Sequence, residues 1–206
     1  MTTLLVIAKE PVPGRVKTRL TPWWTAEEAA RLAEAALSDT LDAVRATPAA
    51  RRVLVLDGAP GAWLPTGIDV VPQIGGGLDE RLAAAFAACS GPALLIGMDT
   101  PQATPALLAQ GLELARGGAV IGPAEDGGFW ALGLADPDPG LLLGVPMSVP
   151  ETGAVQRRLV DAGLTVRDLP RLRDVDTAGD ARAVAAETPG SRFAAAVARL
   201  AGTTAR

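Results

Sequence analysis

The sequence contains no histidine and only one cysteine among its 206 residues. Without histidine, the chain cannot use His-ligated zinc or a Ser-His-Asp or Cys-His mechanism. The single cysteine, Cys89, excludes an internal disulfide, and its alanine-rich surroundings suggest a small core residue rather than a nucleophile. Any acid–base catalysis or metal binding by this chain must therefore use carboxylates, lysine or hydroxyl groups.

Long apolar runs and an excess of positive charge are also missing. No stretch of about 18 apolar residues occurs and no basic segment leads into an apolar run at the N-terminus, so we predict neither a membrane span nor a signal peptide. The net charge of −4 and the pI of about 4.9 argue against nucleic-acid and membrane-surface partners. We expect a cytoplasmic protein, and the sequence does not indicate its oligomeric state.

Lysine is scarce too, and both lysines lie in one short segment. This segment is Lys9 to Leu20, KEPVPGRVKTRL, and it follows an apolar run, Leu4 to Ala8. Convergent cations on a slim, glycine-containing turn are typical of phosphate binding, although a solvated basic turn would have the same composition. The spacing of a Walker loop is absent. We predict that the segment binds the phosphates of a ligand through Lys9, Gly14, Arg15, Lys17 and Arg19.

Short apolar runs alternate with helical patterns along the rest of the chain. This alternation predicts a single three-layer α/β domain over residues 1–201, with a short tail at 202–206 that frays. Thr25 and Glu28 form a capping box at the start of the first helix, and Pro48 ends it. The strands are expected at residues 3–8, 52–56, 68–71, 93–98, 119–122, 129–134 and 164–169. The helices are expected at 25–47, 78–86, 152–162, 177–186 and 193–200, with a short helical turn within 136–150. Another helix is expected to begin at Pro105, with Thr104 as its cap.

Two aspartates are candidates for a metal site. Asp99 follows the most apolar strand, so it lies at the carboxyl edge of the sheet, where Mg²⁺ or Mn²⁺ could bridge to phosphates. A turn-forming aspartate before Thr100-Pro101 is the alternative. Asp176 is a weaker candidate from spacing alone, because Asp176 or Thr177 can also cap the following helix.

Two further segments are candidates for ligand contacts. Glu125 and Asp126, followed by two glycines, could simply form a turn. They could also bind acceptor hydroxyls or provide a general base. Gln73 to Arg81, QIGGGLDER, places three glycines before a helix, where a base or ribose could lie against the backbone; its candidate binding residues are Gln73, Gly76 and Arg81. We expect Trp130 in the core rather than as a stacking platform.

Five motifs together resemble a known bacterial family. They are K-x-P-x-P-G-x-V-K-T-R-L at Lys9 to Leu20, Q-x-G-G-x-L…R at Gln73 to Arg81, I-G-x-D-x-P at Ile96 to Pro101, G-P-A-E-D-G-G-F at Gly122 to Phe129, and D-V-D-T at Asp174 to Thr177. The chain resembles the DUF2064 family of the nucleotide-diphospho-sugar transferase superfamily, which is grouped with GT-A-type glycosyltransferases. A related branch, the 2-phospholactate guanylyltransferase-like enzymes, is similar in three of these elements: K-T-R-L, D-x-P and D-V-D-T.

The resemblance implies a GT-A/Rossmann-like fold with a mostly parallel mixed sheet. It also implies a nucleotide-activated donor under the first loop and a divalent metal, Mg²⁺ or Mn²⁺, near Asp99 and Asp176. The middle motif has one acid where many GT-A enzymes have D-x-D, which leaves single-metal coordination or metal-free catalysis open. Asp79 stands where the family pattern leads us to expect glycine.

Three functions remain open at this point. The first is an NDP-sugar-dependent glycosyltransferase, with Glu125 or Asp126 orienting or deprotonating an unknown acceptor. The second is a nucleotidyltransferase that joins an NTP to a small phosphorylated or carboxylated acceptor. The third is a nucleotide-binding module without catalysis. The sequence does not identify the base, the sugar or the stereochemical outcome.

Overall fold

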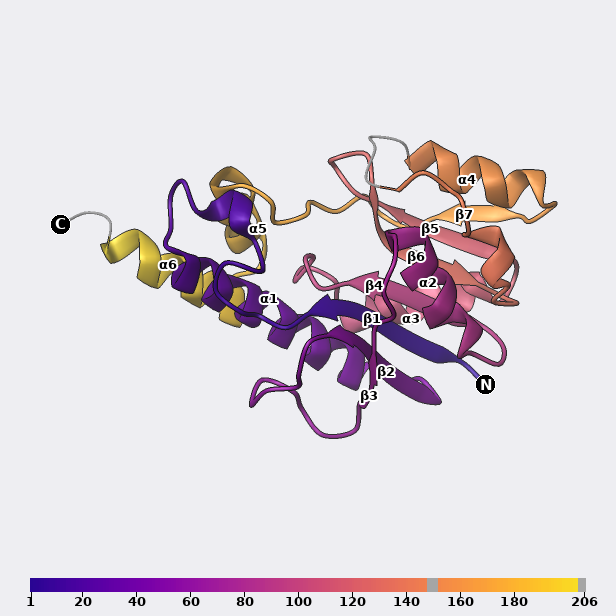
Figure 1. The fold of residues 1–206 in the computed structure, drawn as a ribbon, viewed down its shortest axis with the longest axis horizontal. Coiled ribbons are helices and arrows are strands. Elements are labelled where there is room, and N and C mark those ends of the chain that lie inside the picture. Colours follow the sequence, from indigo (N-terminus) through magenta and orange to yellow (C-terminus); the bar gives the residue numbers. More distant parts are fainter. Residues whose placement is uncertain (148–151, 204–206) are drawn as a thin grey trace.

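The computed structural model describes residues 1–147 and 152–203, and a seven-stranded sheet forms its centre (Figure 1). The strand order is β3-β2-β1-β4-β6-β5-β7, and only β6 runs against its neighbours, so the sheet is mixed but mostly parallel. The α/β fold predicted from the sequence is confirmed. The strands are β1 (Thr3–Lys9), β2 (Arg51–Asp57), β3 (Asp69–Pro72), β4 (Ala93–Gly97), β5 (Ala119–Pro123), β6 (Phe129–Leu134) and β7 (Val166–Asp168).

Helices cover both faces of the sheet, as expected for strands that are apolar along their whole length. Each predicted strand is present, with boundaries that differ by up to two residues. The α-helices are α1 (Ala26–Ala46), α2 (Leu78–Ala87), α3 (Pro105–Ala115), α4 (Thr152–Asp161), α5 (Ala178–Glu187) and α6 (Arg192–Thr203), and the 3₁₀ turns are η1 (Thr18–Leu20) and η2 (Pro139–Leu141). Helix α6 includes the first two residues of the predicted tail, while residues 204–206, like the end of the predicted turn region at 148–150, lie outside the described residues.

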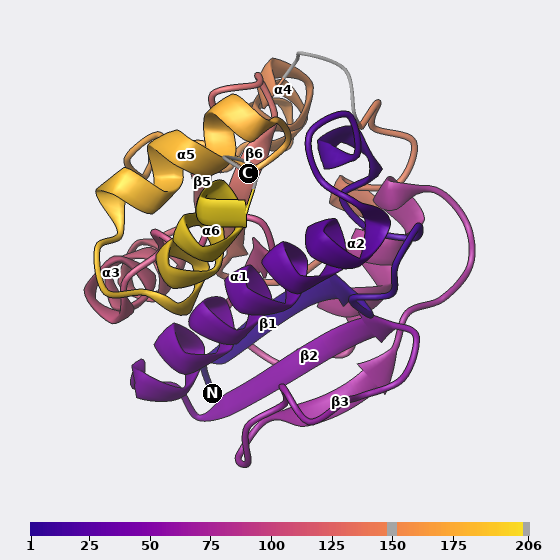
Figure 2. The ribbon, with the colours of Figure 1, turned by 90° about the vertical axis from the view of Figure 1, so that its left-hand side faces the viewer.

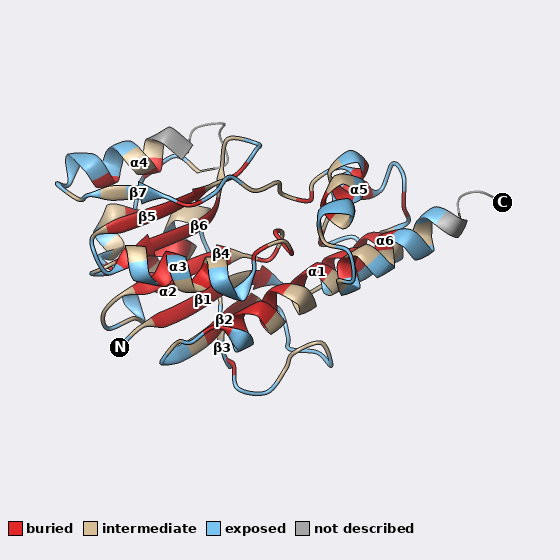
Figure 3. Ribbon diagram, turned by 180° about the vertical axis from the view of Figure 1, so that it is seen from behind, coloured by how far each residue is buried: buried red, intermediate tan, exposed pale blue. Residues whose placement is uncertain are grey.

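Three apolar clusters hold these layers together. The first lies between the sheet and helices α1 and α3, and the second between the sheet and helices α2 and α4. Cys89 packs against the second cluster, in agreement with its predicted role. The third cluster lies beyond the sheet, where α5 and α6 pack beside the first half of α1 (Figures 1 and 2). Figure 3 shows the inner strands of the sheet and the inner faces of α1 and α3 as buried, whereas the edge strands β3 and β7 are mostly exposed.

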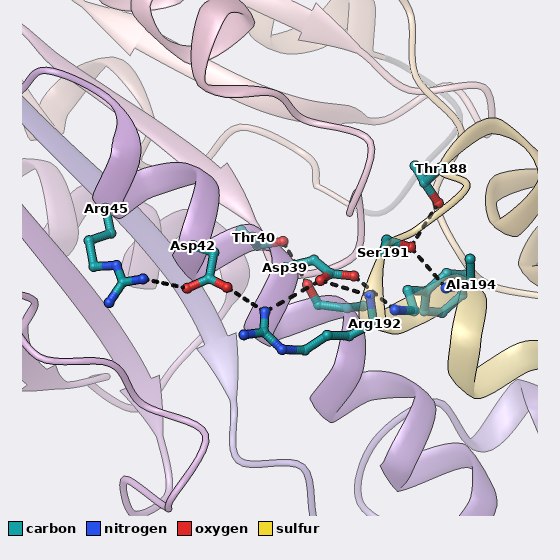
Figure 4. Close-up of polar contacts among 10 residues, drawn as sticks. Asp39, Thr40, Asp42, Arg45, Thr188, Ser191, Arg192 and Ala194 are labelled. Carbon is teal, nitrogen blue, oxygen red and sulfur yellow. Dashed lines mark hydrogen bonds and ion pairs between the residues drawn. The ribbon is translucent and has the colours of Figure 1, made fainter.

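Helix α1 connects the sheet to the third cluster. The predicted capping box is confirmed: the Thr25 hydroxyl accepts from the Glu28 N–H at 3.2 Å, and the Glu28 carboxylate accepts from the Thr25 N–H at 2.9 Å. Midway along α1, Asp39 accepts the N–H groups of Arg192 and Phe193 at 3.1 and 2.8 Å, at the start of α6 (Figure 4). The Arg192 guanidinium also contacts Asp42. These contacts fix the C-terminal helix pair to α1.

The sheet topology brings distant loops to one edge. Strand β1 lies between β2 and β4 and is parallel to both, so the segments that follow Lys9, Asp57 and Gly97 leave the sheet side by side. The Lys9 N–H approaches the Met98 sulfur at 3.2 Å. Among the described residues, no helix is long and apolar enough to cross a membrane.

Candidate active site

The basic segment after β1 folds into a tight loop with an unusual backbone. Gly14 has φ of 76°, and Lys17 has φ of 49°, which makes it the one non-glycine residue with positive φ in the described part of the chain. A side chain in the left-handed region is held there at a cost in free energy, and such residues gather at functional sites. The unusual backbone at Lys17 therefore agrees with a binding role for this residue.

An ion cluster forms where the loop meets the sheet edge. Lys17 Nζ lies 2.9 Å from Asp99 Oδ2 and 3.3 Å from Asp176 Oδ1. Arg19 Nη1 lies 2.7 Å from the other oxygen of Asp176. The structure therefore brings together the two predicted metal ligands and two of the predicted phosphate-binding cations, from three distant parts of the sequence.

Lys17 is the most buried member of this cluster, with 9% of its side chain exposed. Burial alone would lower the pKa of Lys17, but the charges of Asp99 and Asp176 outweigh that effect and raise its pKa above the ordinary value. Lys17 is therefore a permanent cation between two carboxylates. Arg19 is different, because its side chain is 77% exposed and its charge faces solvent.

A backbone contact brings Asp176 to Asp99. Residues 169–177 run from β7 to α5 across the carboxyl edge of the sheet, and the Val175 N–H donates to the Asp99 carbonyl at 3.2 Å. The Thr177 side chain caps α5 by accepting from the Asp180 N–H, and Asp180 accepts in return from the Thr177 N–H. Because Thr177 and Asp180 cap the helix, Asp176 remains available to the ion cluster.

Asp174 belongs to the same edge, and no role for it was predicted from the sequence. Its Oδ1 atom is buried and has no hydrogen-bond partner among the described residues. Burial, followed by the nearby carboxylates of Asp126 and Asp99, raises the pKa of Asp174 to about 7. The signal in the sequence was the first acid of the D-V-D-T motif, but its burial depends on a long-range crossing that spacing does not reveal.

Two cavities adjoin the ion cluster. The first, which we call the loop cavity, has a volume of about 270 Å³ and is lined by Lys9, Arg15, Val16, Lys17, Thr18, Arg19, Met98, Asp99 and Asp176. All four predicted loop cations therefore face one space. The second, which we call the acidic cavity, has a volume of about 550 Å³ and shares Arg19, Asp99 and Asp176 with the first. Its further polar side chains are Asp126 and Asp174.

The other predicted ligand-binding residues occupy different positions. The Gln73 amide donates to the carbonyls of Ala8 and Val55 at 2.6 and 3.1 Å, and Arg81 donates to Gln73 at 3.2 Å. These contacts hold the start of α2 against the sheet edge. None of Gly14, Gln73, Gly76 and Arg81 lines either the loop cavity or the acidic cavity, so their contact with a ligand stays a prediction.

The predicted catalytic pair is divided by the structure. Asp126 lines the acidic cavity, and its Oδ1 accepts from the Gly128 N–H at 2.7 Å, which shapes the turn. Glu125 instead pairs with Arg173 at 2.8 Å and does not line that cavity. Asp126 is therefore the better placed of the two to meet an acceptor. Trp130 is buried, as predicted, although it also lines the acidic cavity.

The carboxylates of the ion cluster could supply some, but not all, of the ligands of a divalent cation. Among the described residues, no group of three or more His, Cys, Asp and Glu side chains is arranged to hold a metal. Asp99 and Asp176 converge on one cation, Lys17, and the neighbouring Asp174 has an orphaned buried oxygen. Two carboxylates together with water and substrate phosphates are a common environment for Mg²⁺. The residues present therefore fit a metal whose remaining ligands come from a substrate.

Residues 40–149 match the family described as "Uncharacterized protein conserved in bacteria (DUF2064)". The chain belongs to this family. The match confirms the family predicted from the motifs, although two of the five motifs, Lys9 to Leu20 and Asp174 to Thr177, lie outside the matched residues. No curated protein matched this DUF2064 chain.

Solved structures agree with the fold over nearly the whole chain. A candidate nucleotide-diphospho-sugar transferase from Desulfovibrio desulfuricans G20 is 27% identical, with a TM-score of 0.85 over 99% of this chain and 95% of that one. Rv0371c from Mycobacterium tuberculosis H37Rv, in complex with manganese, is 22% identical, with a TM-score of 0.54 over 89% and 96%. A nucleotidyl transferase from Methanothermobacter thermautotroptrophicus is 16% identical, with a TM-score of 0.57 over 87% and 94%. The last two likenesses concern the fold alone.

Proposed function

We propose that this DUF2064 protein is a transferase that uses a nucleotide-activated donor, and that the donor is an NDP-sugar. One observation carries the proposal: Lys17 and Arg19 from the loop meet Asp99 and Asp176 at a single cavity on the carboxyl edge of the sheet. Cations for phosphates beside carboxylates for a metal are the two requirements of a diphosphate donor. The solved relative described as a candidate nucleotide-diphospho-sugar transferase supports this reading.

The chain's own residues would act mainly through charge. Lys9, Lys17 and Arg19 would bind the diphosphate and stabilise the negative charge that develops on it as the bond to the sugar breaks. Asp99 and Asp176 would hold Mg²⁺ or Mn²⁺, which supplies further neutralisation of the departing diphosphate. The structurally similar Rv0371c was solved in complex with manganese, which supports a divalent ion as the cofactor. Asp126 would orient the acceptor from the adjoining cavity.

Ligand-induced stabilisation tests the proposal. We would measure the melting temperature with a panel of NDP-sugars and NTPs, each with and without Mn²⁺. A ligand at about 100 times its Kd stabilises the native state by about 2.7 kcal/mol, which raises the melting temperature of a domain of this size by roughly 5–10 °C. No shift with any nucleotide would refute the proposal.

A matched pair of variants locates the binding. Arg19→Gln should fold normally because the side chain is mostly exposed, and we expect about tenfold weaker nucleotide binding from the loss of one charge-assisted contact. Arg116→Gln removes an arginine of the same charge from a surface ion pair on α3. Equal shifts for the two variants would place the nucleotide elsewhere.

A nucleotidyltransferase is the second candidate, and the number of cations favours it. Lys9, Arg15, Lys17 and Arg19 all line the loop cavity, which is enough charge for the three phosphates of an NTP. In that reaction the acceptor attacks the α-phosphorus and pyrophosphate leaves. Release of pyrophosphate from an NTP in the presence of candidate acceptors would favour this function, whereas release of an NDP from an NDP-sugar favours glycosyl transfer.

A further inference from the structure

Much of the acidic cavity is lined by apolar side chains, which would not contact the phosphates of a donor. Its apolar lining comes from strands β1, β4 and β6, from α2, and from α4 with the preceding Pro146 and Met147. A cavity of about 550 Å³ with such walls has the size and composition of a small-molecule site. Its apolar lining residues are Ile7, Leu78, Leu82, Leu95, Phe129, Trp130, Pro146, Met147 and Val155.

The charged side chains of the acidic cavity are mostly acidic. Its carboxylates are Asp99, Asp126, Asp174 and Asp176, and the one cation among the described lining residues is Arg19. Arg19 already pairs with Asp176 at 2.7 Å. A metal held between Asp99, Asp176 and a diphosphate would likewise be neutralised by its own ligands. The part of the cavity beyond the ion cluster therefore repels anions.

The hydrogen-bonding capacity of the cavity points the same way. Asp174 Oδ1 is buried without a partner among the described residues, and a carboxylate accepts hydrogen bonds. A hydroxyl or ammonium group of a ligand donates hydrogen bonds and would satisfy this oxygen. An ionised phosphate or carboxylate has no proton to donate to this oxygen, and it would add a like charge beside the Asp126 carboxylate.

We infer that the acidic cavity binds the acceptor, and that the acceptor is a neutral or cationic hydroxyl compound with an apolar body. The inference rests on the function proposed above and specifies its second substrate. The juxtaposition that carries it is a set of apolar walls around carboxylates, with the loop cavity opening beside them. A phosphorylated or carboxylated acceptor is disfavoured by the same juxtaposition.

In the corresponding reaction one bond forms and one bond breaks. The acceptor oxygen forms a bond to the anomeric carbon of the donor sugar, and the bond from that carbon to the diphosphate oxygen breaks. The NDP leaves with the electron pair of that bond, and the hydroxyl proton passes to a carboxylate of the acidic cavity. No oxidant or further reactant is required.

Three probes that carry different charges test the inference. They are 4-methylbenzyl alcohol, 4-(hydroxymethyl)benzylamine and 4-(hydroxymethyl)benzoate, which share a ring and a hydroxymethyl group. Binding to the full chain with Mg²⁺ is measured from the NMR shift of the Trp130 indole N–H, which Trp130→Phe identifies among the four tryptophans. We expect the amine and the neutral alcohol to bind at least about tenfold more tightly than the carboxylate.

A charge variant and its control sharpen the result. Asp126→Asn keeps the Oδ1 atom that accepts from Gly128 but removes the charge, and it should reduce the preference for the amine over the carboxylate several-fold. Glu113→Gln removes one charge from a surface ion pair on α3 and should leave the preference unchanged. An equal change in both variants would mean that net charge, rather than the cavity, sets the order, and would overturn the inference.

The remaining outcomes separate this inference from the proposed function. Tighter binding of the carboxylate, or no shift of Trp130 with any probe at about 10 mM, overturns the inference even if nucleotides still raise the melting temperature. If the expected charge order is found but no nucleotide binds, the proposed function fails. The assignment of a neutral or cationic hydroxyl ligand to the cavity then still stands.

Discussion

Replacing Asp174 by asparagine should make the protein more stable at neutral and alkaline pH. Asp174 is a largely buried carboxyl whose pKa burial and neighbouring carboxylates raise to about 7, from a reference of 3.8. A raised pKa means that the folded state holds a proton more tightly than the unfolded state does. Folding is therefore opposed wherever this group must ionise.

The sign and the size follow from the two pKa values. Below about pH 4 both states are protonated and Asp174 contributes no pH dependence. Between about pH 4 and pH 7 the folded state binds one more proton, so stability falls with rising pH by about 1.4 kcal/mol per unit. Over these three or so pH units, the loss in free energy of unfolding approaches about 4 kcal/mol as an upper limit, and the loss stays constant above pH 7.

Urea unfolding between pH 4 and pH 9, in EDTA, measures this effect. We expect Asp174→Asn and the wild type to differ little at pH 4, and the variant to be more stable by roughly 2–4 kcal/mol at pH 8. Glu113→Gln, which removes an exposed carboxylate on α3, serves as the control and should follow the wild type at every pH. A constant difference between Asp174→Asn and the wild type across the range would refute the reasoning.

Two other substitutions test the packing of the fold. Asp39→Ala should cost about 1–2 kcal/mol in urea unfolding, because Asp39 accepts two N–H groups at the start of α6, and a loss below about 0.3 kcal/mol would contradict this role. Gly122→Ala should lower the free energy of unfolding by about 1–3 kcal/mol, because the added Cβ would lie 2.4 Å from the Trp130 ring. Gly179→Ala adds a Cβ whose nearest contact is 3.5 Å away, so this variant should be neutral or slightly stabilised. Equal stability of the two glycine variants would show that the strand can move away from Trp130.

The sequence predicted the parts of the site that follow directly from strand ends. Asp99 and the basic loop each come straight after an apolar strand, and β1 and β4 are neighbours, so a parallel sheet places both segments at one edge. Only the resemblance favoured Asp176, because spacing could not tell a helix cap from a ligand. In the structure Thr177 and Asp180 share the capping, and Asp176 contacts Lys17 and Arg19.

The parts that the sequence did not predict depend on long-range contacts of single side chains. Ligand contact by Gln73 stays a prediction, and nothing in the sequence indicated that its amide donates to the carbonyls of β1 and β2. Glu125 was considered together with Asp126, and its pairing with Arg173 arises only because residues 169–177 cross the sheet edge. The acidic cavity depends on the same crossing, which brings Asp174 beside strands that are remote in sequence.

The third apolar cluster connects the C-terminal helices to the site. Leu20, directly after Arg19, and Val175, directly before Asp176, are both buried in this cluster with the residues of α5 and α6. The distance between the loop cations and Asp176 is therefore set partly by how α6 docks on α1. Since Asp39 fixes the start of α6, Asp39→Ala should also reduce the nucleotide-dependent rise in melting temperature.

This coupling can be separated from a general loss of stability. Gly122→Ala destabilises the sheet from within the β5–β6 pair and leaves the third cluster intact, so it serves as the comparison. At matched destabilisation, Asp39→Ala should weaken nucleotide binding several-fold more than Gly122→Ala. If both variants bind nucleotide as tightly as the wild type, the loop and Asp176 hold their positions without the C-terminal helices, and the third cluster contributes only to folding.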